Sequence, residues 1–142
     1  MIKSIGWATS NTLGSKEKLF KWRIDNNKLE IYREMQNGPE CRSVTLLDLE
    51  YINSYVSKSK WTHLANSVSK IPDGTEKEGI GRFMYEDLGL SVSDAQLVSH
   101  ISALFCQAGI WESNGVVRGM MFRKMQDDWK SALVDLFNRN VS

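Results

Sequence analysis

The side chains with the greatest chemical potential are two histidines, His63 and His100, and two cysteines, Cys41 and Cys106. Acid–base or nucleophilic catalysis needs a histidine beside a nucleophile or a carboxylate, and neither histidine has such a partner at a characteristic spacing. His100 and Cys106 are six residues apart in a predicted helix, so they do not share a face. No pair has the spacing of zinc ligands. The sequence therefore predicts no catalytic residue, no metal site and no cofactor.

A second chemical candidate is the glycine pair around Ile80 in the segment 79–81. It lacks the third glycine of a dinucleotide-binding loop and the Gly-Lys-Ser/Thr of a P-loop. We therefore expect these glycines to allow a close backbone approach at the start of a helix. The neighbouring carboxylates are interpreted as a solvated helix face, formed by Glu76, Glu78, Glu86 and Asp87.

The composition is that of one ordinary domain over residues 1–142, with 42% hydrophobic and 25% charged residues. The apolar runs, such as 103–106, are far shorter than the roughly 20 residues of a membrane span. The N-terminus lacks the apolar stretch of a signal peptide. We therefore expect no membrane partner and a cytoplasmic location.

The charges are unevenly distributed although the net charge is only +1. Residues 1–60 carry ten basic and seven acidic side chains, and residues 111–142 carry five and four. Residues 61–110 carry three basic and six acidic side chains. The acidic middle segment disfavours a partner with a phosphate backbone, because Lys and Arg supply most of the affinity for nucleic acids.

The N-terminal part, about residues 19–45, is predicted to be a hairpin or a small antiparallel sheet. Apolar and polar residues alternate over 19–34, and Asn26-Asn27 suits a two-residue turn because asparagine tolerates positive φ. The register pairs Ile24 with Leu29, Trp22 with Ile31 and Phe20 with Arg33 on one face, and Arg23 with Glu30 and Lys21 with Tyr32 on the other. A third strand is expected over 41–44. Residues 1–18 leave two interpretations, a short strand or a loose arm.

Helical spacing predicts a first helix over about 46–57, with Thr45 as its N-cap. A short second helix is expected from Trp61, Leu64, Ala65 and Val68, which would share one face. The chain is expected to contain about four helices and a closing C-terminal helix, and the remaining ones lie in the C-terminal half.

Two capping-box patterns predict the next helices. Thr75 and Glu78 would begin a helix over about 78–88, and Ser93 and Gln96 a helix over about 94–108, which Gly109 would end. A closing helix is expected over about 127–139. Together with the strands, these elements predict an α+β fold.

The sequence between 110 and 124 predicts a second hairpin, with a two-residue turn at Asn114-Gly115. This turn places Trp111 opposite Arg118, on one face with Met120 and Phe122. The other face carries Ile110, Val117 and Met121, so both faces of the hairpin are expected to be largely apolar. One face can pack on the helix 94–108. The other needs a cover, for which the C-terminal helix and a second subunit are the alternatives.

The order of helix 78–88, a short bend, helix 94–108 and a hairpin resembles a winged helix-turn-helix over about residues 61–124. In that family the second helix reads the DNA major groove and the hairpin touches the backbone or minor groove. The resemblance therefore implies nucleic-acid contacts from Gln96, Ser99, His100, Arg118, Arg123 and Lys124. However, helix 94–108 contains no Lys or Arg, and Asp94 lies at its start. Winged helices also serve as protein-interaction modules.

The sequence thus predicts a non-enzymatic interaction or accessory protein, a homodimer or the partner of another protein. The expected contact surface is the second hairpin with the last helix, anchored by Trp111, Arg118, Met120, Phe122 and Trp129. The first alternative is a winged-helix regulator that binds nucleic acid. The second alternative is an enzyme whose site assembles from residues that are distant in the sequence.

Overall fold

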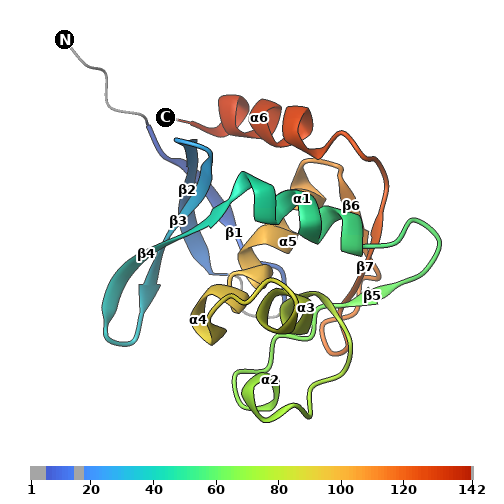
Figure 1. The fold of residues 1–142 in the computed structure, drawn as a ribbon. Coiled ribbons are helices and arrows are strands. Elements are labelled where there is room, and N and C mark those ends of the chain that lie inside the picture. The colour runs from blue at the N-terminus through green and yellow to red at the C-terminus, as the bar shows by residue number, and fades with distance from the viewer. Residues whose placement is uncertain (1–5, 15–17, 142) are drawn as a thin grey trace.

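The computed structural model describes residues 6–14 and 18–141 and has the α+β fold expected from the sequence (Figure 1). The first half contains β1 (Ala8–Asn11), β2 (Leu19–Asp25), β3 (Lys28–Met35), β4 (Gly38–Thr45) and α1 (Leu46–Tyr55). The second half contains β5 (Thr62–His63), α2 (Lys70–Asp73), α3 (Ile80–Glu86), α4 (Val92–Ala95), α5 (Val98–Gln107), β6 (Trp111–Ser113), β7 (Met121–Lys124) and α6 (Trp129–Asn140).

The first four strands form an antiparallel sheet in the order β1-β2-β3-β4. The predicted hairpin register is confirmed, because Trp22 pairs with Ile31, and Arg23 with Glu30. Asn26 and Asn27 adopt the positive φ values that the tight turn requires. The predicted third strand is β4. The segment 1–18 contributes the edge strand β1, and its first five residues lie outside the described ones.

Helix α1 begins as predicted, since Thr45 Oγ1 accepts a hydrogen bond of 3.0 Å from the Asp48 amide. This bond satisfies one of the free amides of the first turn. The helix buries Leu49, Ile52 and Asn53 and turns its other face to solvent.

The predicted helix with Trp61, Leu64, Ala65 and Val68 on one face is wrong. Residues 62–63 instead form β5, which pairs with β7 in a three-stranded sheet ordered β5-β7-β6. Ala65 has a φ of 50°, which is incompatible with a right-handed helix. Two residues are too few for strand periodicity to be visible, and the pairing partner lies about 60 positions away.

The two predicted capping boxes are not formed. The amide and hydroxyl of Thr75 bond to Asp73 rather than across to residue 78, and α3 begins after Gly79 without a side-chain cap. Ser91, not Ser93, caps the next helix through the Asp94 amide. The expected helix over 94–108 is consequently two helices, α4 and α5.

The predicted two-residue turn at Asn114-Gly115 is also wrong. Ser113 pairs with Phe122 and Trp111 with Lys124, so residues 114–120 form the connecting loop. The Asn114 side chain holds this loop, because its Oδ1 accepts from the Met121 amide at 3.1 Å. Arg118 therefore lies in the loop and does not face Trp111.

Helix α5 lies in the middle of the molecule, between the four-stranded sheet and the three-stranded sheet (Figure 1). It is buried on almost every side, by β1, α6 and β6 among others. Its apolar side chains belong to one hydrophobic cluster that runs from Ala8 in β1 to Leu136 in α6. The two sheets therefore share a core.

The close approach expected at Gly79 and Gly81 is present. Gly81 donates its amide to the Leu64 carbonyl at 2.9 Å, and a Cβ atom on Gly81 would lie 2.3 Å from the Ala65 carbonyl oxygen. The two glycines thus let the start of α3 lie against the chain that leaves β5.

Replacing Gly81 by alanine is expected to lower the free energy of unfolding by about 1–3 kcal/mol, because the new methyl group meets a backbone carbonyl that cannot rotate away. Urea denaturation followed by circular dichroism measures the change. An unaltered midpoint would show that the start of α3 does not lie against residues 64–65.

Candidate functional site

The expected contact surface on the second hairpin is covered within this chain. Trp111, Phe122 and Trp129 are buried, so they cannot anchor a partner, whereas Arg118 is exposed and Met120 is half-buried. The Trp111 indole contacts Phe105 and Phe122. Its Nε1 donates to Asn53 Oδ1 of α1 at 2.8 Å, and Trp129 Nε1 donates to Glu50 of the same helix. Helices α1 and α6, rather than a second subunit, close this face.

The residues that the winged-helix resemblance assigns to nucleic-acid contact are largely occupied with other contacts. Gln96 Nε2 donates to the Asn66 carbonyl, and His100 is buried against Phe20. Ser99, the next residue of that set, donates to the Gln96 carbonyl.

The basic residues of the same set are also engaged, apart from the exposed Arg118. Arg123 pairs with Glu112 and lies over the Trp61 ring, and Lys124 Nζ bonds the Asn53 carbonyl at 3.1 Å. Since α5 is surrounded by protein, it does not present a free face of the kind that fits a DNA groove.

One cavity, the His100 pocket, brings polar residues from three parts of the chain together. It measures about 280 Å3, and its polar lining includes Thr12, Lys18, Arg33, Gln96, Ser99 and His100. The pocket lies between the β1–β2 connection, the sheet and the start of α5. His100 and Arg33 are only 7% and 8% exposed.

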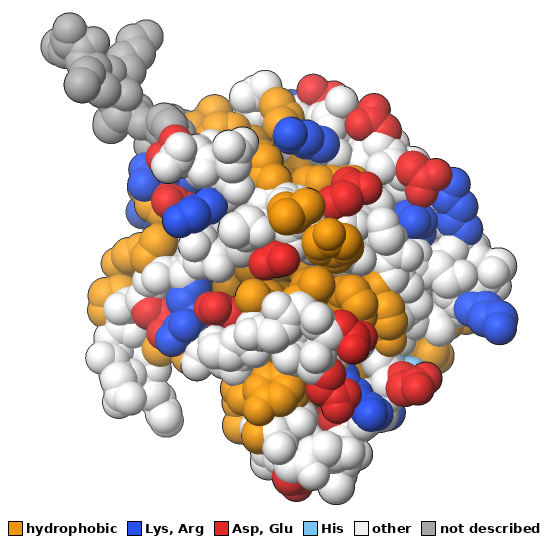
Figure 2. All heavy atoms as spheres, viewed as in Figure 1, with side chains coloured by type: hydrophobic (Ala, Val, Ile, Leu, Met, Phe, Trp, Pro, Cys, Tyr) orange, Lys and Arg blue, Asp and Glu red, His pale blue; other side chains and the backbone are white. Residues whose placement is uncertain are grey.

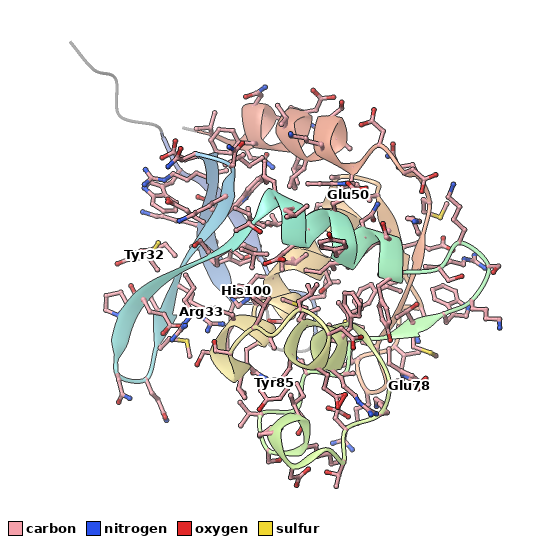
Figure 3. All side chains as sticks on the ribbon, in the orientation of Figure 1. Tyr32, Arg33, Glu50, Glu78, Tyr85 and His100 are labelled. Carbon is pink, nitrogen blue, oxygen red and sulfur yellow. The ribbon has the colours of Figure 1, made fainter. Side chains whose placement is uncertain are left out.

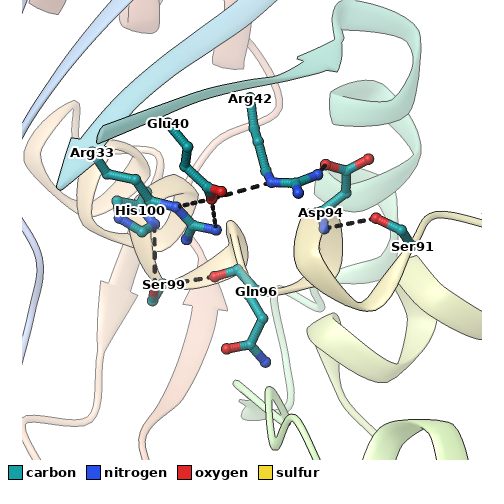
Figure 4. A network of polar contacts seen from close by, with 8 residues as sticks. All are labelled: Arg33, Glu40, Arg42, Ser91, Asp94, Gln96, Ser99 and His100. Atoms are coloured by element: carbon teal, nitrogen blue, oxygen red, sulfur yellow. Dashed lines mark hydrogen bonds and ion pairs between the residues drawn. The ribbon is translucent and has the colours of Figure 1, made fainter. Parts of the chain in front are cut away.

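A network of ion pairs fixes the Arg33 side of this pocket (Figure 4). Arg33 Nε donates to Glu40 Oε1 at 2.8 Å, and Arg42 Nε donates to the same oxygen at 3.1 Å. Arg42 also reaches Asp94 at 3.1 Å, which links β4 to α4. Glu40 thus divides its charge between two guanidinium groups, and together they lower the pKa of its carboxyl, with the Arg33 hydrogen bond as the largest cause.

His100 is neutral at pH 7. Burial, followed by the charges of Arg33 and Lys18, lowers its pKa to about 4, against an opposing effect of Glu40. Its Nδ1 lies 3.2 Å from Ser99 Oγ, while its Nε2 has no hydrogen-bond partner among the described residues.

The Ser99–His100 contact lacks the features of a catalytic serine. A nucleophilic serine needs a histidine whose second ring nitrogen is oriented by an acidic group. No carboxylate bonds His100 in the described part of the chain, and Ser99 Oγ also lies 3.2 Å from the Gln96 carbonyl. The arrangement favours binding over nucleophilic catalysis.

The second hollow, the aromatic–acidic groove, lies between the end of α1 and α3. It measures about 300 Å3 and is lined by Tyr55, Glu78, Gly79, Arg82, Phe83, Glu86 and Asp87. The rings of Tyr55 and Phe83 stack with their centroids 4.3 Å apart. Arg82 is bound by Glu86 at 2.6 Å, whereas Glu78 and Asp87 form no ion pair within the described residues.

The carboxylates act on the stacked ring of Tyr55. Burial raises the pKa of Tyr55, and the negative charges of Glu78 and Asp87 raise it further. The groove is therefore a place of negative potential beside an aromatic surface.

An exposed apolar stripe on α1 leads into this groove. Leu47, Tyr51 and Tyr55 are spaced four residues apart and so lie on one face of the helix. Leu47 is 64% and Tyr51 51% exposed. Figure 2 shows apolar side chains gathered across the middle of this face, over α1 and α3, with acidic side chains around them.

The pocket and the groove are separate sites. Figure 3 places Arg33 and His100 on the side of the four-stranded sheet, and Glu78 near β5 on the far side of α3. The expected solvated face of carboxylates needs one correction, since Glu76 is buried and accepts hydrogen bonds from the amides of Ser67 and Lys77.

In the predicted helices 46–57 and 78–88, Tyr55 and Phe83 fall at the apolar helical spacing expected of core residues, whereas Leu47 and Tyr51 do not. The available signal was that these two apolar residues fall outside the buried spacing of Leu49 and Ile52. Their connection with Phe83 depends on how α1 packs on α3.

The remaining candidates form no site. Both cysteines are free, and burial raises the pKa of Cys106 to about 12, so its thiol stays protonated. His63 is half-buried, and its Nδ1 has no hydrogen-bond partner in the part of the chain that the structure describes. Within residues 6–14 and 18–141, no three His, Cys, Asp or Glu side chains gather as metal ligands would.

Nor do the described helices include one with the length and apolarity that crossing a membrane requires. No family model, curated protein or solved structure matches the chain.

Proposed function

We propose that this protein is a non-enzymatic interaction domain that binds a basic segment of a partner protein. The partner would occupy the aromatic–acidic groove and the adjoining stripe of Leu47, Tyr51 and Tyr55. The observation that carries this proposal is the exposed apolar stripe, which continues into a stacked aromatic pair. This pair is bordered by carboxylates that form no ion pair within the described residues. Exposed aromatic side chains of this kind are enriched in interface hot spots.

The chemistry of the groove defines the partner segment. A Lys or Arg side chain next to the Tyr55 and Phe83 rings gains a cation–π contact, and Glu78 and Asp87 supply opposite charge. An apolar residue of the partner would cover Tyr51 and Leu47. Complementary charge accelerates association and disfavours acidic partners.

The surface of this proposal differs from that expected from the sequence. Self-association through the second hairpin is not supported, because Trp111, Phe122 and Trp129 are buried in the core and cannot contact a second subunit. The relationship to winged-helix proteins also stays a proposal. It is supported by the order of α3, α4–α5 and the hairpin β6–β7 along the chain, which is the order of elements in that family. Within it, a protein-interaction role fits this chain better than DNA binding, because α5 is buried and residues 61–110 are acidic.

Selection of binders from a random peptide library tests the proposal without knowledge of the natural partner. We expect the selected peptides to combine Lys or Arg with aromatic or aliphatic residues. Replacing Tyr51 by alanine should weaken their binding about tenfold, as expected for a central aromatic contact. Fluorescence anisotropy with a labelled peptide measures the affinity.

Matched controls are available on α6. Val134→Ala removes an exposed apolar side chain, and it should leave the affinity unchanged. Selection of acidic peptides, or of peptides whose binding is indifferent to Tyr51→Ala, would overturn the proposal.

A further inference from the structure

The His100 pocket is not used by the proposed interaction and has the features of a separate ligand site. Ligand sites combine an apolar wall with a few converging polar groups. Here the apolar wall comes from Leu13, Leu19 and Met35. The polar groups come from the same segments and from the chain around the start of α5. The volume of about 280 Å3 is near the lower limit of small-molecule sites, so the ligand must be small.

The polar groups of the pocket have unused hydrogen-bonding capacity. Arg33 is 8% exposed and bonds Glu40 through Nε and Nη2, which leaves Nη1 without a partner among the described residues. His100 is 7% exposed, and its Nε2 is likewise without a partner in the described chain. Neither atom is among the fully buried side-chain atoms that lack a partner, so both are open to the pocket and within reach of a ligand.

The charges of the pocket select the class of ligand. Lys18 and Arg33 are the cationic groups of the lining. Glu40 neutralises the charge of Arg33 only in part, because it also pairs with Arg42. Glu34, an exposed carboxylate, also lies at the lining. The balance suits one negative charge and disfavours a dianion.

We propose that the His100 pocket binds a small monocarboxylate with an apolar tail. The carboxylate accepts hydrogen bonds from Lys18 and Arg33 beside the His100 ring, and the tail lies against Leu13, Leu19 and Met35. A charged hydrogen bond to Arg33 is the stronger kind of contact, since the guanidinium is already desolvated.

Benzoate serves as the probe, with benzamide as its uncharged counterpart and inorganic phosphate as the dianionic one. The chain has only two histidines, so its two imidazole signals in NMR spectra can be assigned with the variant His100→Gln. We expect benzoate to shift the His100 ring signals saturably, with a Kd of about 1 mM or below, and to leave those of His63 unchanged.

Lys18→Gln should raise the benzoate Kd about tenfold, because an exposed cation at the pocket is lost while the buried ion pairs remain. Lys21→Gln, which removes an exposed lysine from β2 outside the pocket lining, is the matched control and should leave the Kd unchanged. Tyr51→Ala should not alter benzoate binding, which separates this site from the groove.

Three results would each overturn the proposal. These are an unshifted His100 ring in excess benzoate, equal binding of benzamide or tighter binding of phosphate, and equal loss of affinity in Lys18→Gln and Lys21→Gln.

Discussion

Replacing Phe105 by alanine is expected to lower the free energy of unfolding by about 3–5 kcal/mol, the usual cost of deleting a fully buried aromatic ring. Phe105 is fully buried in α5, where its ring lies 4.7 Å from that of Trp111 and 6.0 Å from that of Trp129. It therefore joins the second hairpin to the last helix. The loss is large beside the roughly 5–15 kcal/mol that stabilise an ordinary domain.

Urea denaturation monitored by circular dichroism measures this change. Phe137→Ala is the matched control, because the Phe137 ring of α6 is only half-buried. Its centroid lies 5.4 Å from that of the Trp22 ring. It should cost clearly less than Phe105→Ala. Equal costs would mean that the core is not centred on α5.

The stability of the protein is expected to fall by about 3 kcal/mol between pH 6.5 and pH 4 because of His100 alone. The pKa of His100 is lowered from 6.5 to about 4 in the folded chain, mainly by burial. In this interval the unfolded chain takes up a proton that the folded chain does not, so acid favours unfolding. The contribution is fully present above pH 6.5 and is lost as the pH falls to about 4. Each pKa unit corresponds to about 1.4 kcal/mol.

Comparison with His100→Gln isolates this effect, since carboxylates such as Glu40 are titrated in both proteins. The difference in unfolding free energy between the two proteins should change by about 3 kcal/mol from pH 7 to pH 4. NMR titration provides a second measurement. A His100 ring that titrates near pH 6.5, or parallel stability curves for the two proteins, would contradict the buried placement.

Local patterns were sufficient to predict the first hairpin and the first helix. Asn26-Asn27 fixes the register of its own neighbours, and Thr45 caps the turn that follows it directly. The same kind of reasoning failed at Asn114-Gly115, because Asn114 uses its side chain to organise a longer loop. A sequence signal for a tight turn does not exclude this alternative use of the same residue.

The functional surfaces were less predictable because they depend on contacts distant in the sequence. Tyr55 and Phe83 have the spacing of core residues, and only the packing of α1 on α3 turns them into a groove wall. His100 was expected on the outer face of a helix, yet Phe20 of β2 lies against it and Arg33 of β3 lines the same pocket. Neither arrangement leaves a periodic trace in the sequence.

A charge exchange across the groove tests the central claim most directly. Glu78 and Asp87 are both replaced by lysine in one variant of the protein. This double substitution breaks no ion pair among the described residues. Asp135→Lys on α6 serves as the control for added positive charge. A selected basic peptide is measured beside a second peptide in which each Lys or Arg is replaced by Glu.

We predict that the Glu78→Lys/Asp87→Lys protein loses the basic peptide and binds the acidic one, while Asp135→Lys behaves as the unaltered protein does. Unchanged binding of the basic peptide by the doubly substituted protein would contradict the claim that the aromatic–acidic groove recognises a basic partner.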